Sequence, residues 1–181
     1  MADLDDNFSL PLRKLVLGGC RSGKSRYAEQ WVARNFADRV FVATLERRGD
    51  PEMDQRIVLH RNSRGEGWQT LEEPLDLPGL LAAQDRPGRV FLVDCLTMWL
   101  TNMLLRDVSD AEIEDAVRRL AATGLTASLV LVANEVGLGI VPESPLGRRF
   151  RDLAGWTNQQ LAATCDQVIF VAAGLPMRLK G

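Results

Sequence analysis

The apolar residues of this chain gather in short runs, which are separated by longer segments with helical spacing. The runs occupy residues 15–18, 40–44, 90–94, 129–133 and 168–172. Short, nearly continuous apolar runs are typical of strands that are buried on both faces of a sheet. Because helical patterns separate most of these runs, the sequence predicts an α/β fold, with a mostly parallel sheet and helices on both of its faces.

Helical apolar spacing is found in residues 25–35, 50–60, 109–124 and 146–164. Ser109 and Glu112 form a capping-box pattern at the start of one of these segments, and Asp50 followed by Pro51 marks the start of another. Gly155 weakens the helix predicted for residues 146–164, because glycine disfavours a helix interior.

The length and composition of the chain fit one folded domain. The sequence has 181 residues, of which 46% are hydrophobic, enough for a single α/β core. We expect residues 1–12 to form a loose extension and residues 13–181 to form one nucleotide-binding catalytic domain. The net charge of −2 offers no broad positive surface, which argues against nucleic acid as a partner.

The cysteines and the apolar segments together indicate a cytoplasmic location. Cys20, Cys95 and Cys165 are odd in number and widely spaced, which favours neither a disulfide framework nor a zinc site. No apolar stretch reaches the roughly 20 residues of a membrane span, and the acidic stretch at residues 2–6 is unlike the start of a secretory signal. We therefore expect a reducing, cytoplasmic environment.

A glycine-rich segment with the spacing G-x-x-x-x-G-K-S lies between the first predicted strand and the first predicted helix. Its residues are Gly18, Gly19, Cys20, Arg21, Ser22, Gly23, Lys24 and Ser25. The glycines let backbone N–H groups point at phosphate oxygens, and the helix that follows adds the positive end of its dipole. The spacing predicts a phosphate-binding loop for a nucleoside triphosphate, in which Lys24 bridges the outer phosphates and Ser25 holds Mg²⁺; a plain glycine-rich turn is the alternative.

Acidic side chains follow two other predicted strands. Asp94 comes directly after residues 90–93 and would hold Mg²⁺ beside the phosphate loop; alternatively, it caps the helix that begins after it. Glu135 lies in the glycine-rich segment 134–142, at the carboxyl end of a strand, where ligands bind in open α/β sheets. Its carboxylate suits Mg²⁺, a substrate hydroxyl or a base, and it suits a helix cap equally well.

His60 is the only histidine in the chain, so any step that needs an imidazole depends on it. On the predicted helix, Arg56, His60 and Arg64 lie at i, i+4 and i+8 along one stripe, with Arg61 adjacent. Guanidinium charge nearby favours the neutral, nucleophilic imidazole and would neutralise a phosphate under attack. The alternative is a solvated basic helix face.

Other charged residues have both a functional and a structural interpretation. Glu72 and Glu73 follow the segment from Trp68 to Leu71, and a carboxylate can accept both hydrogen bonds that guanine donates from N1 and its amino group. Two adjacent glutamates are also common on surfaces without any function. The arginines at positions 148, 149 and 151 either contact phosphate or pair with acidic neighbours.

Several separated motifs occur together in this chain. They are GGCRSGKS, FVATL, D-P-E-M-x-x-R-I-x-x-H-R-x-x-R, W-x-T-x-E-E-P, V-D-C-L-T, N-E-V-G-L-G-I-V-P and F-R-D-x-A-G-x-x-N-Q-x-L-A. In this order, from about Lys14 to the C-terminus, they resemble the bifunctional adenosylcobinamide kinase/adenosylcobinamide-phosphate guanylyltransferase family of cobalamin biosynthesis. The resemblance implies a RecA-like P-loop NTPase fold and a homotrimer.

The resemblance also implies two reactions. In the first, the γ-phosphate of ATP or GTP passes to a hydroxyl group of adenosylcobinamide. In the second, the family's histidine, whose place His60 takes, attacks the α-phosphorus of GTP, releases pyrophosphate and carries GMP as a phosphoramidate. Adenosylcobinamide phosphate then displaces the histidine, and the product is adenosylcobinamide-GDP.

The family's site residues correspond by position to residues of this chain. Lys24 and His60 would be catalytic, and Ser25 and Asp94 would hold Mg²⁺. Besides the phosphate loop, the nucleotide would be bound by Ala43, Thr44, Leu45, Arg61, Asn62, Ser63, Arg64, Glu72 and Asp94. The chain departs from the family at Cys20, where alanine is common, and at residues 46–51, which carry fewer carboxylates that could serve Mg²⁺ or cobinamide.

Two other classes of function remain as alternatives. One is a P-loop kinase of another small metabolite, which would leave the His60 cluster unused. The other is a RecA-like ATPase that acts on nucleic acid or a protein partner, and nucleic acid would require a basic surface that the net charge does not indicate.

Overall fold

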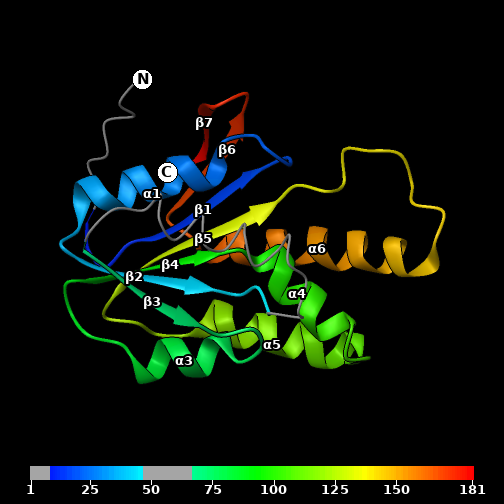
Figure 1. Cartoon of the computed structure of the whole chain (residues 1–181), viewed down its shortest axis with the longest axis horizontal. Coiled ribbons are helices and arrows are strands. Elements are labelled where there is room, and N and C mark those ends of the chain that lie inside the picture. The colour runs from blue at the N-terminus through cyan, green and yellow to red at the C-terminus, as the bar shows by residue number, and fades with distance from the viewer. Residues whose placement is uncertain (1–8, 47–66) are drawn as a thin grey trace.

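The structure, a computed structural model, describes residues 9–46 and 67–181. Its centre is a seven-stranded sheet with the strand order β3-β2-β4-β5-β1-β6-β7 (Figure 1). The strands are β1 (Arg13–Gly18), β2 (Asp38–Ala43), β3 (Trp68–Glu72), β4 (Arg89–Asp94), β5 (Ser128–Asn134), β6 (Gln167–Ala172) and β7 (Leu175–Lys180). Neighbouring strands are parallel, except that β7 pairs antiparallel with β6. The mostly parallel sheet predicted from the sequence is confirmed.

The described helices are α1 (Lys24–Asn35), α3 (Leu77–Ala83), α4 (Leu96–Leu104), α5 (Asp110–Ala122) and α6 (Pro145–Thr164). At the start of α5, Ser109 and Glu112 make both hydrogen bonds of the capping box. The helices predicted over residues 25–35, 109–124 and 146–164 are confirmed, and Gly155 lies inside α6 without interrupting it. The helix predicted over residues 50–60 lies outside the described residues.

The helices divide between the two faces of the sheet. Helix α1 packs on one face through apolar residues around Trp31, while α3, α4, α5 and α6 cover the opposite face (Figure 1). Strand side chains alternate between the two layers, so that in β1 Val16 faces α1 whereas Leu15 and Leu17 face the other helices. Helices on both faces explain why the strands read as continuous apolar runs.

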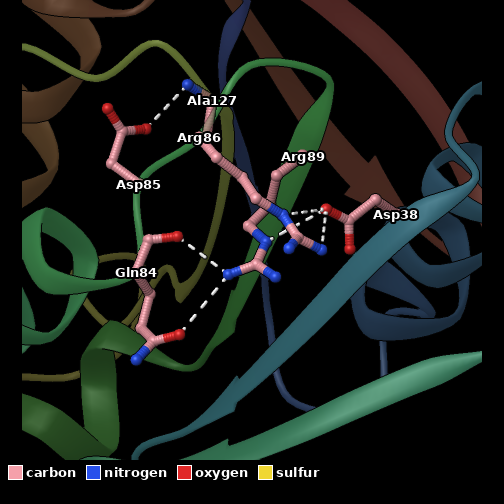
Figure 2. A network of polar contacts seen from close by, with 6 residues as sticks. All are labelled: Asp38, Gln84, Asp85, Arg86, Arg89 and Ala127. Atoms are coloured by element: carbon pink, nitrogen blue, oxygen red, sulfur yellow. Dashed lines mark hydrogen bonds and ion pairs between the residues drawn. The ribbon is translucent and has the colours of Figure 1, made fainter.

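Charged side chains hold the amino edge of the sheet, where β2 and β4 begin. Asp38 and Arg89 are the first residues of these strands and lie opposite each other in the register. The Asp38 carboxylate accepts hydrogen bonds from Arg89 Nε, 3.2 Å away, and from Arg86 Nε at 2.8 Å (Figure 2). Asp85 accepts a 2.8 Å bond from the backbone N–H of Ala127, just before β5. These bonds fix where the strands start, and therefore where they end.

The described chain joins the sheet just before β1. Leu12 is 3% exposed, its N–H donates to Ser128 Oγ at 3.0 Å, and its carbonyl accepts from the N–H of Leu129 at 2.8 Å. The division into a loose extension and one catalytic domain stays a prediction.

Candidate functional site

The residues that the sequence singles out gather at the carboxyl edge of the sheet. Because the strands are parallel, the register places Gly18 beside Asn134, and Ala43 beside both Asp94 and Glu72. Strand β5 lies between β1, which leads into the phosphate loop, and β4, which ends at Asp94. Ligands of open α/β sheets bind at this edge, so these residues form the candidate site.

The segment between β1 and α1 folds as a compact loop with the backbone geometry that its glycines allow. Gly23, the N-cap of α1, has a φ of 96°, and Arg21 has a φ of 55°. A Cβ atom on Gly18 would lie 2.5 Å from both Ser22 Oγ and the carbonyl oxygen of Val171. Glycine is therefore required at position 18 by close approach and favoured at position 23 by its backbone angle.

Lys24 lies at the start of α1 and directs its amine back over the loop. Its side chain is 9% exposed, and Nζ donates to the carbonyl oxygen of Gly19 at 3.4 Å. Helix α1 has no acidic residue in its first turn and no side-chain hydrogen bond at its N-cap. The positive end of the helix dipole and the ammonium group therefore point into the same region, which suits an anion such as phosphate.

Asp94 ends β4 next to Cys95, whose half-buried thiol lies within electrostatic range of both the Asp94 carboxylate and the Lys24 ammonium. Burial, and to a smaller extent the Asp94 carboxylate, raise the pKa of that thiol to about 11, although the Lys24 ammonium acts to lower it. The thiol is therefore protonated near neutral pH and is unsuited to act as a nucleophile. Cys95, one residue after Asp94, is the N-cap position of α4.

Ser25 and Asp94 offer the oxygen ligands that a magnesium site needs. A hydroxyl and a carboxylate are hard ligands, and Mg²⁺ in nucleotide sites commonly takes one or two protein oxygens together with phosphate and water. Within residues 9–46 and 67–181, no group of three or more His, Cys, Asp or Glu side chains is arranged to hold a metal ion. The Ser25 hydroxyl and the Asp94 carboxylate are ligand types that fit a magnesium–nucleotide complex.

Thr44 has a structural role that the sequence did not reveal. It is fully buried; its Oγ1 donates to the Cys95 carbonyl at 2.7 Å and accepts from the Cys95 N–H at 2.9 Å. The Thr44 carbonyl accepts a 2.6 Å bond from Asn102 Nδ2 of α4. Thr44 thus ties the end of β2 to β4 and α4, while the flanking Ala43 and Leu45 are only half-buried.

The two glutamates after β3 differ in their surroundings. Glu73 Oε1 accepts bonds from the backbone N–H groups of Leu75 and Asp76, at 2.8 and 2.7 Å, and so shapes the turn into α3. Glu72 is the last residue of β3 and is exposed. The Glu73 carboxylate therefore serves this turn, whereas the register places Glu72 beside Ala43 at the carboxyl end of β3.

The loop after β5 also contributes to the edge of the site. The backbone N–H of Glu135 donates to the carbonyl of Gly18 at 3.0 Å, which joins this loop to the first residue of the phosphate loop. The Glu135 carboxylate accepts a 2.6 Å bond from the N–H of Gly137. The next helix, α6, has Ser144 as its N-cap, so the Glu135 carboxylate does not cap it, and a role in ligand binding stays a prediction.

The three arginines of α6 bind neighbouring groups of the protein, as the structural interpretation of these residues predicts. Arg148 Nη1 donates to the carbonyls of Pro142 and Glu143, at 3.0 and 2.6 Å. Arg149 pairs with Asp110 at 2.6 Å, and Arg151 pairs with the adjacent carboxylate of Asp152 at 2.9 Å. These bonds orient α6 and its approach rather than the phosphate loop.

The remaining predicted site residues fall on the part of the chain that is not described. They are Arg56, His60, Arg61, Asn62, Ser63 and Arg64. The description stops at Glu46, whose carboxylate pairs with Arg106 at 2.5 Å, and resumes at Gly67. In the described ranges, every helix is too short or too polar to cross a membrane.

Sequence comparison relates the chain to one family along nearly its whole length. The family model described as "Cobinamide kinase / cobinamide phosphate guanyltransferase" matches residues 14–179. The bifunctional adenosylcobalamin biosynthesis protein CobP of Pseudomonas aeruginosa is 48% identical over 173 residues, which cover 94% of this chain and 98% of that protein. The bifunctional adenosylcobalamin biosynthesis protein CobU of Escherichia coli is 40% identical over 182 residues, covering 92% and 98%.

Solved structures with a similar fold are distant in sequence. The structure of PH0250 from Pyrococcus horikoshii has a TM-score of 0.58 at 11% identity, covering 96% of this chain and 88% of that one. The type III secretion ATPase EscN of enteropathogenic E. coli has a TM-score of 0.54 at 12% identity, covering 90% and 43%. At such identities the likeness concerns the fold alone, and it agrees with the RecA-like P-loop NTPase fold that the family resemblance implies.

Proposed function

The chain belongs to the cobinamide kinase / cobinamide phosphate guanyltransferase family, and from this membership we infer that it is a transferase with two activities. It phosphorylates adenosylcobinamide with ATP or GTP, and it then transfers GMP from GTP to adenosylcobinamide phosphate in cobalamin biosynthesis. The observation that carries this inference is the family match over residues 14–179. The phosphate loop at the carboxyl edge of the sheet agrees with it.

For the kinase reaction, we assign the phosphate-directed work to the start of α1. The loop from Gly18 to Ser25 holds the triphosphate through backbone N–H groups, and the Lys24 ammonium neutralises the outer phosphates as the γ-phosphoryl group moves to the acceptor hydroxyl. Support comes from the orientation of Lys24 Nζ, which donates within the loop to Gly19. Ser25 and Asp94 would hold Mg²⁺, which neutralises charge on the β- and γ-phosphates when bound.

For the guanylyl transfer, we propose His60 as the nucleophile. Its neutral imidazole attacks the α-phosphorus of GTP and pyrophosphate leaves, so that a covalent guanylyl-histidine divides a difficult transfer into two easier steps. The proposal is supported by the stripe of Arg56, His60 and Arg64 in the sequence and by the absence of any other histidine from the chain. Arg61 to Arg64 would complete the GTP site.

We propose Glu72 as the acceptor for guanine. A carboxylate takes the hydrogen bonds of guanine N1 and its amino group together, which adenine does not offer. The exposure of Glu72 supports this role, as does its register position beside Ala43, which with Thr44 and Leu45 would lie along the nucleotide. The buried Thr44 hydroxyl is hydrogen-bonded to the backbone of Cys95, so Thr44 would contact the nucleotide through its backbone atoms.

The location, oligomeric state and domain organisation of the enzyme are part of the same proposal. We propose that it acts in the cytoplasm as a homotrimer, with residues 13–181 as its catalytic domain and residues 1–12 as an extension. Its ligands would be adenosylcobinamide and its phosphate, GTP, ATP and Mg²⁺, without nucleic acid. A P-loop kinase of another metabolite and a RecA-like ATPase are the weaker candidates, because neither accounts for the whole set of motifs.

The test supplies the chain with Mg²⁺, adenosylcobinamide and ATP that is labelled at the γ-phosphate. We expect the label in adenosylcobinamide phosphate, and after addition of GTP we expect adenosylcobinamide-GDP, identified by its mass. Hydrolysis of ATP without transfer of label to adenosylcobinamide would contradict the kinase assignment. Formation of adenosylcobinamide phosphate without the GDP product would contradict the second activity alone.

A further inference from the structure

The turn between β6 and β7 lies directly against the phosphate loop. Ala172 and Leu175 are paired, so the turn consists of Ala173 and Gly174, whose φ angles of 50° and 80° are those of a type I′ hairpin. The backbone N–H of Gly174 donates to the carbonyl of Ser22 at 2.8 Å. A hairpin near the end of the chain thus contacts a loop about 150 positions earlier in the sequence (Figure 1).

The two segments approach each other closely at Gly23 and Gly18. A Cβ atom on Gly23 would lie 3.2 Å from the Cα atom of Gly174, and a Cβ atom on Gly18 would lie 2.5 Å from the carbonyl oxygen of Val171 in β6. Gly18 and Gly23, two of the three glycines of the phosphate motif, therefore face β6 and its turn. On the other side, the carbonyl of Gly18 accepts from the N–H of Glu135. The loop is held between two backbone segments.

The bond from Gly174 determines where a phosphate donor points. In a planar trans peptide, the carbonyl and the following N–H point in opposite directions. When Gly174 binds the Ser22 carbonyl, the N–H of Gly23 is directed away from the hairpin. A phosphate-binding loop depends on N–H groups that point inward and carbonyls that point outward. The hairpin therefore holds one peptide of the loop in the orientation that an anion requires.

We propose that the β6–β7 hairpin is a positioning element for nucleotide binding, and that Gly174 is its positioning residue. Gly174 does not touch the nucleotide; it acts through Ser22 and Gly23. This inference rests on the proposed function only in so far as the loop binds a nucleoside triphosphate. It adds a specific requirement, that nucleotide affinity depends on a left-handed residue in a turn outside the phosphate motif.

Gly88 provides a matched control for this requirement. Like Gly174, it has a φ of 80°, and a Cβ atom added to either residue would meet nothing within 4 Å. Alanine at either position therefore introduces the same backbone strain and no steric contact. Gly88 lies in the turn that leads from Arg86 to Arg89, at the amino edge of the sheet, whereas Gly174 lies at the phosphate loop.

The experiment measures the Kd for GTP with Mg²⁺ by calorimetry, and the Tm of the same preparations, for Gly174→Ala and Gly88→Ala. We expect both variants to lose a similar amount of Tm. Gly174→Ala should raise the Kd about tenfold, whereas Gly88→Ala should leave it within about twofold of wild type. Asparagine tolerates the left-handed region better than alanine, so Gly174→Asn should raise the Kd less than Gly174→Ala does.

Equal Kd values for Gly174→Ala and Gly88→Ala would overturn the proposal, because strain alone would then explain the loss. If Gly174→Ala does not fold, the asparagine pair decides: a higher Kd for Gly174→Asn than for Gly88→Asn supports the positioning role, and equal values refute it. Failure of the wild-type chain to bind GTP would instead overturn the proposed function, and the hairpin's role would fall with it.

Discussion

At the scale of single residues, the candidate site depends on a positive charge, that of Lys24, which is in position before an anion binds. Lys24 is buried, yet among the residues that the structure describes its amine has only a 3.4 Å bond to Gly19 to offset the loss of solvent. A bound triphosphate would supply much stronger partners for the same ammonium group. The residue is therefore arranged for an anion more than for the stability of the loop.

Replacement of Lys24 tests this arrangement. We expect Lys24→Ala to lower γ-phosphoryl transfer at least about 100-fold, because a preorganised charge that faces the transferred group is removed. Lys180→Ala is the matched control, since Lys180 donates instead to the carbonyls of Ala162 and Ala163. Turnover assays of the two variants should differ strongly; near-normal turnover by Lys24→Ala would refute the role of this lysine.

For Thr44 we expect an effect on stability rather than on turnover, because its side chain serves the fold. Thr44→Val keeps the shape but removes both hydroxyl bonds to Cys95, and it leaves a partly buried N–H unpaired. We expect a loss of about 1–3 kcal/mol in the free energy of unfolding, measured with urea. Thr70→Val removes a hydroxyl from the neighbouring strand β3 and should cost less. Equal losses in the two variants would show that the Thr44 bonds are unimportant.

The sequence predicted the local motif at this site better than the contacts around it. The spacing from Gly18 to Ser25 is a local signal, so the turn and the start of α1 could be recognised directly. Thr44 and Asn102 gave no such signal, because their roles arise only when β2, β4 and α4 are brought together. Residue chemistry alone also left Glu72 and Glu73 equivalent; the family resemblance selected Glu72, and the structure shows that Glu73 serves the turn into α3.

At the scale of secondary structure, burial decided which elements could be predicted. Strands β1, β2, β4, β5 and β6 are covered on both faces, and their apolar runs revealed them. Strand β3 is short and carries polar residues, while β7 is exposed and contains Pro176, so neither has a clear apolar pattern. The β6–β7 turn was also hidden, because Ala173-Gly174 lacks the asparagine that usually marks a type I′ hairpin.

That turn can be improved by one substitution. Ala173 has a φ of 50°, a left-handed conformation that alanine tolerates poorly and asparagine tolerates well. We expect Ala173→Asn to raise the free energy of unfolding by about 0.5–1 kcal/mol, measured by urea denaturation. Ala172→Asn, in the adjacent paired strand position, is the control and should not stabilise the chain. An unchanged or lower stability of Ala173→Asn would contradict the turn geometry.

The charged network at the amino edge should make stability depend on pH. Burial alone would raise the pKa of Asp38, but bonds to Arg86 and Arg89 outweigh it and hold the pKa below its usual value. Burial would also raise the pKa of Asp85, but hydrogen bonds from the backbone N–H groups of Thr126 and Ala127 outweigh this effect and lower the pKa. Both carboxylates therefore contribute stability above the unfolded pKa of about 4, and that contribution is lost as the pH falls through the lower folded values.

Urea unfolding between pH 6 and pH 3 measures this dependence. We expect the double variant Asp38→Asn/Asp85→Asn to be less stable than wild type at pH 6 and closer to it at pH 3. Asp115→Asn, which removes an exposed carboxylate from α5, should change the profile little. Parallel profiles for wild type and the double variant would contradict the assignment of acid sensitivity to this network.

At the scale of the whole molecule, the two edges of the sheet have different tasks. The amino edge is fixed by Asp38, Arg89 and Asp85, while the carboxyl edge carries the phosphate loop, Asp94 and Glu72. Parallel strands bring residues from distant motifs to this one edge of the sheet. The order of these motifs along the chain predicted both the fold and the family. The contact of the hairpin with the phosphate loop could not be predicted, because the sequence of neither segment indicates that it packs against the other.

We propose that the nucleotide held by this loop is also attacked at its α-phosphorus by His60. The most direct measurement incubates the chain with Mg²⁺ and GTP labelled at the α-phosphate, denatures it, and counts protein-bound label for wild type and His60→Ala. We expect label that is labile to acid and stable to alkali, as in a phosphoramidate, on the wild type alone. No label on the wild type, or equal label on both proteins, would contradict the account.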